Sequence, residues 1–315
     1  MRSGCSSGKR TTLSIAWPFV AMCAACFALA SGMLMSQNRP SGQLDKQTTE
    51  KKFEDFDSDK FAGSTQIDND WMPMKPGMRF VYDGTSFEDG KAVPHRIIVN
   101  VTDLIKVIAG IRAVVTWDLD YSDGELTEAE LAFFAQDKDG NVWRMGEYTE
   151  EYDGGKFVAA SPWVHGLEGA RAGIEMKAKP QLGTPSYSQG WGPAVNWADR
   201  GRVDQMGQKT SVPAGRYEDV LVIAETSRSE PDAQQLKYFA RGVGNVRVAW
   251  RGAGEKTKET LELTKIEKLD AKALAEVRVG ALKLETSGYK NSKNVYARTP
   301  RAAPTPGTDG KSTSK

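Results

Sequence analysis

The central part of the chain alternates between hydrophobic and more polar positions with a period of two. In residues 96–103, Ile97, Val99 and Val101 occupy alternate positions, and residues 257–264 repeat the alternation. Successive side chains of a β-strand point to opposite faces of the sheet, so this period is typical of strands. The pattern therefore predicts strands with one buried face and one wetter face.

Short turn motifs separate the alternating runs. Most of them pair glycine with a residue that tolerates a positive φ angle, as tight turns require. They are Asp83-Gly84, Asp89-Gly90, Ala109-Gly110, Asp123-Gly124, Asp139-Gly140-Asn141 and Asp153-Gly154-Gly155. Runs of about five to ten residues between such turns are typical of an antiparallel meander. The sequence predicts a mainly β fold, a single antiparallel domain built as a curved sheet or half-barrel.

Residues 166–202 interrupt the alternation. They are rich in glycine, proline and alanine, and Trp191 and Trp197 lie among these small residues. We expect this long irregular segment to cross the sheet and to be packed, because large aromatic side chains favour burial. Residues 126–134 have helical propensity, but their position between two turns favours a strand.

The N-terminal part of the chain contains an export signal. Residues 11–38 carry no charged side chain and follow Arg2, Lys9 and Arg10. A basic start, an apolar run and small residues near position 30 are typical of a signal peptide. The length of the run also fits an uncleaved N-terminal membrane anchor. In both cases the basic residues keep the start of the chain in the cytoplasm and the remainder is exported.

The composition divides the chain into five parts. We predict a signal peptide or N-terminal membrane anchor over residues 1–30 and a disordered linker over residues 31–70, which are polar and charged. The β-rich domain follows over residues 71–269, with a short helix over residues 270–286. Residues 287–315 are rich in Pro, Thr, Ser and Lys, which predicts a disordered tail. The location is periplasmic, extracellular or at the outer face of the membrane.

Cysteine usage and charge narrow the class of protein. Cys5, Cys23 and Cys26 all precede residue 31, so cleavage after residue 30 leaves no cysteine for disulfides, thiol catalysis or zinc binding. Lipid attachment at Cys23 or Cys26 is a third mode of anchoring, although the preceding residues fit the lipoprotein pattern poorly. The 42 basic and 41 acidic residues nearly balance, which argues against a nucleic-acid partner.

Four sequence blocks resemble a family of uncharacterised bacterial exported proteins and lipoproteins. The blocks are residues 135–147 (AQDKDGNVWRMGE), residues 74–77 (MKPG) leading into 80–82, residues 166–170 (GLEGA) and residues 238–244 (YFARGVG). The resemblance covers residues 71–269 and implies an exported, β-rich single domain. Members similar to this chain often carry a clear lipobox and a Gln-Glu pair near position 189. This sequence lacks both, so neither feature is carried over.

Residues 118–130 (DLDYSDGELTEAE) echo a calcium-binding loop. Glu130 and Gly124 have the spacing of an EF-hand, but the alignment puts Leu119 and Tyr121 where two oxygen ligands belong. The preceding residues read as strand rather than helix. A β-turn is therefore the favoured interpretation, and calcium binding stays open as an alternative function.

The two histidines differ as candidates for a site. His95 follows Pro94 at the start of a predicted strand, and we expect it at the surface. His165 lies beside Trp163 where the irregular segment begins, which makes it the better candidate. The predicted β-rich domain, residues 71–269, has no G-x-S-x-G, His-x-x-x-His or P-loop motif to support nucleophilic, zinc or nucleotide chemistry.

Carboxylates and aromatic residues complete the candidates. Glu147, Glu150, Glu151 and Asp153 follow Trp143, a composition found in sugar-binding sites. Charged residues at alternate positions of a strand more often form the face of that strand that is exposed to solvent. A carboxylate-based glycan hydrolase is therefore kept only as an alternative function. We expect Trp143 in the core.

The predicted binding residues are Trp163, His165, Trp191 and Trp197. Large amphipathic rings among small residues are suited to a hydrophobic or glycan ligand. We predict no catalytic residue, no metal site and no cofactor. The favoured function is that of an exported, non-catalytic envelope or extracellular protein with a binding or structural role.

Overall fold

The computed structural model describes residues 50–88, 90–228 and 230–305. The predicted export segment and most of the linker lie outside these residues, as does the end of the tail. The described residues belong to a single compact unit.

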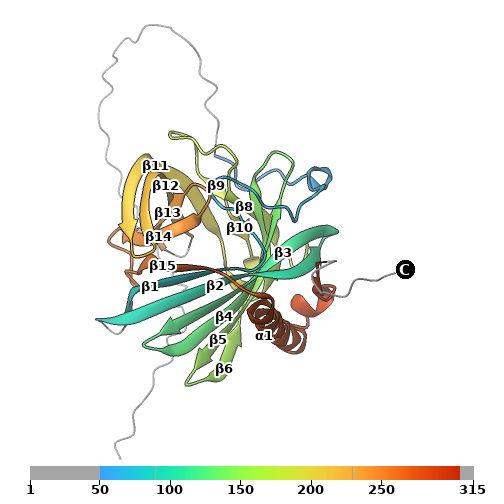
Figure 1. Ribbon diagram of the computed structural model, residues 1–315. Helices are drawn as coiled ribbons and strands as arrows, with labels where there is room; N and C mark the ends of the chain where they lie inside the picture. Colours follow the sequence, from blue (N-terminus) through green and yellow to red (C-terminus); the bar gives the residue numbers. More distant parts are fainter. Residues whose placement is uncertain (1–49, 89, 229, 306–315) are drawn as a thin grey trace, which may run out of the picture. The chain divides into compact units, whose positions relative to one another are not determined.

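One antiparallel sheet of sixteen strands makes up most of the described chain (Figure 1). The first eight strands are β1 (Met78–Glu88), β2 (Lys91–Ile108), β3 (Ile111–Ser122), β4 (Glu125–Gln136), β5 (Val142–Asp153), β6 (Lys156–Ala160), β7 (Trp163–Val164) and β8 (Arg171–Met176). The others are β9 (Tyr187–Ser188), β10 (Gly190–Trp191), β11 (Asp199–Val212), β12 (Gly215–Ser227), β13 (Glu230–Ala240), β14 (Gly244–Arg251), β15 (Thr260–Lys268) and β16 (Ala303–Pro304). The predicted mainly β class and single curved sheet are confirmed.

The predicted turns are correct at most positions. Asp123 and Gly124 join β3 to β4 and have φ angles of 48° and 82°, as a two-residue hairpin turn requires. Residues 126–134, whose helical propensity competes with their position, belong to strand β4. The Asp83-Gly84 prediction is wrong: both residues lie inside β1, where a Cβ on Gly84 would come within 1.7 Å of the Thr260 carbonyl oxygen. Gly84 therefore serves close strand packing, not a turn.

The irregular segment of residues 166–202 links the two ends of the sheet. The strand order runs β10-β8-β5-β4-β3-β2-β1-β15-β14-β13-β12-β11-β9. β9 and β10 are consecutive in the chain, with Gln189 between them. Gly190 pairs with Ala172 of β8, and Ser188 pairs with Arg200 of β11. A stretch that looks irregular in sequence thus contributes three short strands.

Alternation places two hydrophobic clusters on opposite faces of the sheet. In β4, Leu131 and Phe133 belong to one cluster, and Ala132 and Phe134 belong to the other. Helix α1 (Ala271–Asn291) covers the first face. Among the described residues, no helix combines the length and apolar character that crossing a bilayer requires. Burial on both faces of one strand leaves little of its surface in water.

Residues 50–70 differ from the predicted disordered linker. They include a 3-10 helix, Ser58–Lys60, and bury Phe61 and Ile67 against the sheet. Phe56 stacks on Phe61 at 5.1 Å between ring centroids and packs edge-on against Trp143 at 5.4 Å. A few well-spaced aromatic residues order a segment whose average composition is polar. We call residues 50–61 the N-terminal strap.

The C-terminal part is also more ordered than predicted. Helix α1 extends past residue 286, and Asp270 caps its start by accepting a hydrogen bond from the Ala273 N–H at 2.8 Å. After the helix come a 3-10 turn, Tyr296–Arg298, and strand β16, which pairs with β2. Tyr296 is fully buried, and the Nζ of buried Lys106 lies 4.2 Å from its ring centroid. The tail therefore supplies part of the cover for an internal cation.

Candidate ligand-binding site

A hollow lies where the N-terminal strap passes the linked ends of the sheet. It has a volume of about 520 Å³, and we call it the Trp191 cleft. Three stretches line it: the strap, the β9–β10 segment, and the adjoining ends of β11 and β12. The lining residues are Lys52, Phe53, Ser188, Gly190, Trp191, Ala198, Asp199, Arg200, Thr226, Ser227 and Arg228. This volume is within the usual range for small-molecule sites.

Two stacked indoles support the floor of the cleft. The rings of Trp163 and Trp197 lie 4.7 Å apart and nearly parallel at 23°. A Cβ on Gly190 would lie within 2.7 Å of both rings, and a Cβ on Gly192 would lie 2.7 Å from Trp163. Glycine at these two positions lets the backbone on either side of Trp191 rest directly on the stack.

Hydrogen bonds fix the strap as one wall of the cleft. The Arg200 guanidinium donates to the carbonyl oxygens of Lys51 and Lys52 at 2.9 and 3.2 Å. In return, the Glu54 carboxylate accepts from the Ser188 N–H at 3.1 Å. Phe53 then packs against Trp191 with 5.9 Å between ring centroids. The cleft is therefore shaped by segments that are distant in sequence.

Two cations flank the Trp191 ring. The Arg228 guanidinium lies 5.7 Å from its centroid, and the Lys52 Nζ lies 6.0 Å from it. Within the described part of the chain, neither side chain forms an ion pair or donates a hydrogen bond to a carboxylate. A cation over an indole face is attracted to the ring without being neutralised. Both positive charges are thus available to a ligand in the cleft.

Asp199 is the one acid among the residues that line the cleft. Burial, and after it the charge of Glu225, raise the pKa of Asp199 to about 7. No described residue donates a hydrogen bond to its carboxyl group. A proton can therefore be held or released at the cleft wall near neutral pH.

A network of buried charges lies behind Asp199. Lys237 pairs with Glu225 at 2.6 Å, and the Gln189 Nε2 donates to the same carboxylate at 2.7 Å. Arg144 pairs with Glu130 at 2.6 Å and with Glu147 at 2.8 Å. Burial raises the pKa of Glu147 to about 8, although Arg144 opposes the shift. The Arg144 guanidinium also lies 5.6 Å from the Trp197 centroid, which connects the network to the cleft floor.

The expectation that the acids after Trp143 form a solvated face is wrong for two of them. Glu147 and Glu150 are only 6% and 3% exposed. Glu150 accepts hydrogen bonds from Tyr148 and Tyr152, each two residues away. The sheet curves around one face while the helix covers the other, so charged positions are buried on both.

His95 is buried, contrary to the expectation of a surface residue. Its Nε2 lies 2.9 Å from a Glu259 oxygen, and its Nδ1 lies 3.4 Å from an Asp120 oxygen. Burial disfavours protonation, but Glu259 and then Asp120 outweigh it and raise the pKa of His95. Burial also raises the pKa of Asp120 to about 7. From the sequence, the position after a proline suggested a surface residue. The sequence did not reveal the partners of His95 on β3 and in the residue before β15.

The four predicted binding residues occupy three different environments. Trp191 lines the cleft, while Trp163 and Trp197 form the stack beneath it. His165 lies apart: its Nδ1 accepts from the Ala172 N–H at 3.0 Å, and its ring lies 4.2 Å from that of Phe56. Burial, and after it Arg171, lower the pKa of His165, so the ring is neutral at neutral pH.

Sequence reasoning missed Lys52, Phe53, Asp199 and Arg228. Lys52 and Phe53 belong to the stretch assigned to a linker, and Asp199 and Arg228 are brought together only by the β11–β12 pairing. The isolated aromatic residues at positions 53, 56 and 61 were the one signal that the polar stretch folds onto the domain.

The calcium-loop segment folds as a hairpin in which acids face each other across strands. Asp118 pairs in register with Glu130, and Asp120 pairs with Glu128. In the described part of the chain, no group of three or more His, Cys, Asp or Glu side chains is placed to hold a metal ion. The segment thus lacks the loop geometry on which the calcium alternative rests.

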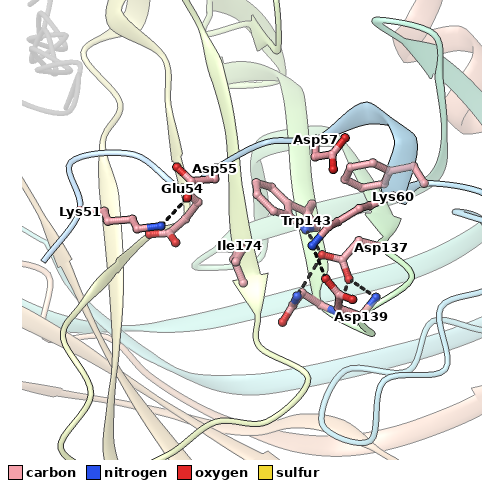
Figure 2. Close-up of a pocket in the computed structure, with 11 residues that line it drawn as sticks. Lys51, Glu54, Asp55, Asp57, Lys60, Asp137, Asp139, Trp143 and Ile174 are labelled. Atoms are coloured by element: carbon pink, nitrogen blue, oxygen red, sulfur yellow. Dashed lines mark hydrogen bonds and ion pairs between the residues drawn. The ribbon is translucent and has the colours of Figure 1, made fainter. Parts of the chain in front are cut away.

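A second hollow lies on the other side of the strap, and Figure 2 shows its lining. It has a volume of about 180 Å³, and we call it the Asp137 hollow. Asp137 accepts hydrogen bonds from the Trp143 indole at 2.8 Å and from the Asn141 backbone and side chain, both at 2.9 Å. Lys60 pairs with Asp139 at 2.5 Å. These groups satisfy one another and tie the strap to the β4–β5 turn.

Comparisons with known proteins find only a low similarity to two solved structures. No family model matches the chain, and no curated protein does. A solved structure from Bacteroides fragilis, of a protein inferred to be exported and to have a YmcC-like fold, shares 12% identity over 63% of this chain and 99% of its own, with a TM-score of 0.39. A structure from Parabacteroides distasonis, of a protein inferred to be a lipoprotein, shares 10% identity over 62% and 97%, with a TM-score of 0.35.

Proposed function

We propose that this chain is an exported, non-catalytic binding protein that holds a glycan in the Trp191 cleft. Export is supported by the uncharged segment that follows the basic N-terminus. The observation that carries the binding role is a partly exposed indole in a cleft of about 520 Å³, beside two cations with which no carboxylate of the described residues pairs.

A glycan fits the cleft better than a purely hydrophobic ligand. Trp191 offers a flat apolar face, on which the C–H face of a sugar ring can stack. Around it lie charged and hydroxyl groups, among them Arg228, Asp199 and Thr226. Mixed apolar and polar lining suits a sugar, whose ring has an apolar face and a polar rim.

The test is a binding screen of the full chain against an array of neutral and acidic oligosaccharides, with two tryptophan variants. Trp191→Ala removes the stacking face. Trp250→Ala is the matched control, because Trp250 is 37% exposed on β14 and does not line the cleft. We expect Trp191→Ala to weaken binding by about tenfold or more, since stacking contributes on the order of 1–2 kcal/mol.

Trp250→Ala is expected to bind like the unaltered protein. The proposal fails if no oligosaccharide binds, or if Trp191→Ala binds as well as Trp250→Ala.

A further inference from the structure

We infer that the Trp191 cleft selects sugars that carry a negative charge. Arg228 and Lys52 bind the anionic group, and the protonated carboxyl group of Asp199 donates a hydrogen bond to it. The inference rests on the proposed glycan-binding function and narrows it to one ligand class. The shared chemistry is a sugar ring with one carboxylate or phosphate substituent.

The positions of Arg228 and Lys52 beside Trp191 favour a ligand with an anionic substituent. Arg228 and Lys52 both lie within 6.0 Å of the Trp191 centroid, and they belong to different segments, the turn after β12 and the strap. A ring that stacks on Trp191 therefore places its substituents beside positive charges. A guanidinium that meets an anion makes a stronger hydrogen bond than it makes with a neutral hydroxyl.

Two other cations lie near the cleft, but Arg200 has polar partners and Arg171 does not line the cleft. Arg200 is held by the Lys51 and Lys52 carbonyl oxygens and by Glu50 at 3.4 Å. Arg171 lies 4.6 Å from the Phe53 centroid, on the side of the strap. In the described ranges, only Arg228 and Lys52 both line the cleft and lack a carboxylate or carbonyl partner for the side chain.

Asp199 makes the binding of an anionic ligand depend on pH. Asp199 lines the same cleft, and no described residue donates a hydrogen bond to its carboxyl group. In the protonated form it adds a donor for the ligand anion, and in the ionised form it repels that anion. The raised pKa of Asp199 places this change near neutral pH.

Other charged groups face Asp199 and influence whether its carboxyl group is protonated. They are Glu225 on β12, Lys237 on β13, Glu175 on β8, and Arg144 and Glu147 on β5, with Lys52 and Arg228 at the cleft. The acids favour the protonated form of Asp199 and the bases favour the ionised form. Because two of these acids, Glu225 and Glu147, already pair with Lys237 and Arg144, burial is the dominant influence.

The experiment measures dissociation constants of the full chain by calorimetry for matched probes. Trigalacturonate and its methyl ester share the same sugar rings, but the ester is neutral. Galactose 6-phosphate and galactose test phosphate as the alternative anion. We expect the acid or the phosphate to bind about tenfold more tightly than its neutral partner, as one charge-assisted contact predicts.

Variants assign the preference to the named residues. Arg228→Gln and Lys52→Gln should each reduce it, and together they should remove it. Arg216→Gln is the matched control, because Arg216 is exposed near the opposite end of β12 and should leave the preference intact. Between pH 8 and pH 6, binding of the acid should tighten severalfold in the unaltered protein and stay constant in Asp199→Asn.

The outcomes separate this inference from the proposed function. If ester and acid bind equally and Trp191→Ala weakens both, the glycan site stands and the anion inference is overturned. It is also overturned if the preference survives in the double variant. If none of the probes binds while other neutral oligosaccharides bind at Trp191, the inference again fails alone. Loss of all glycan binding overturns both.

Discussion

The two hollows beside the N-terminal strap contain similar residues and differ in how their charges are satisfied. In the Asp137 hollow, Asp137 accepts several hydrogen bonds and Lys60 pairs with Asp139. In the Trp191 cleft, Arg228 and Lys52 lie against an indole, and no described carboxylate pairs with them. Figure 2 shows the hydrogen bonds and ion pairs among the residues that line the Asp137 hollow.

This difference separates a structural junction from the proposed binding site. A buried polar group that already has all its partners gains nothing from a ligand, because the ligand would replace bonds of equal strength. A charge held over an aromatic ring keeps most of its capacity to bind an anion. Composition alone could not distinguish the two hollows, since both contain acids, bases and a tryptophan.

The largest effect is expected beneath the cleft, at Gly190. Gly190→Ala puts a Cβ within 2.7 Å of Trp163 and Trp197, at a φ of 152° that favours glycine. Overpacking and backbone strain together should lower the free energy of unfolding by about 3–4 kcal/mol in chemical denaturation. Gly183→Ala, which also has a positive φ but meets open space, should cost only about 1 kcal/mol. Equal losses in the two variants would show that the indole stack does not fix the backbone.

A somewhat smaller loss of stability is expected in the Asp137 hollow. Asp137→Ala leaves the Trp143 indole N–H and the Asn141 N–H without their acceptor, and should reduce the free energy of unfolding by about 2–3 kcal/mol. Asp139→Ala, which removes an exposed ion pair with Lys60, should cost less than about 1 kcal/mol. Both variants should bind glycans normally. A binding defect in Asp137→Ala at full stability would contradict the structural role.

Two carboxyl groups, Asp199 at the cleft and Asp120 beside His95, predict an unusual pH dependence. The pKa values of Asp199 and Asp120 are both raised to about 7 in the folded chain, so the folded chain holds protons that the unfolded chain has released. Stability from these groups is full below about pH 4 and is lost as the pH rises through 7.

We expect a loss of roughly 1–2 kcal/mol per group between pH 5 and pH 8, reduced from the full value because both side chains are partly open to water. Asp199→Asn and Asp120→Asn should each flatten the profile measured by thermal or chemical unfolding. A profile that rises over this range would contradict the assignment.

The smallest effect concerns the strap itself. Arg200→Gln removes the bonds to the Lys51 and Lys52 carbonyl oxygens. Hydrogen exchange of residues 50–56 should accelerate by about tenfold, while the global free energy of unfolding changes by less than about 1 kcal/mol. Lys209→Gln, on an exposed pair with Glu218, provides the control. Unchanged exchange in the strap would mean that Phe53 and Phe56 hold it without Arg200.

The alternating pattern was sufficient to predict the sheet, because each strand follows a local rule of side-chain direction. It predicted β4 correctly even against helical propensity. It misjudged Glu147, Glu150 and His95, since their burial depends on elements that cover the strand from afar. The polar average composition of the two terminal segments likewise predicted disorder around Phe61 and Tyr296. Both side chains are buried, and one large buried side chain is enough to order a segment.

The candidate site was only partly accessible to sequence reasoning. An aromatic residue among glycines indicated Trp191, whose backbone needs space that only glycine allows on either side. Arg228 and Asp199 become neighbours through the β11–β12 pairing, and Lys52 through the strap, and no local pattern encodes those contacts.

The most direct test follows the indole N–H signals of Trp191 and Trp143 by two-dimensional ¹⁵N NMR while trigalacturonate is added to the full chain. The Trp143 Nε1 donates to Asp137 in the closed hollow, whereas Trp191 lines the open cleft. The account predicts that the Trp191 signal shifts in a saturable way and that the Trp143 signal does not move. A shift of Trp143 with Trp191 unchanged would contradict it.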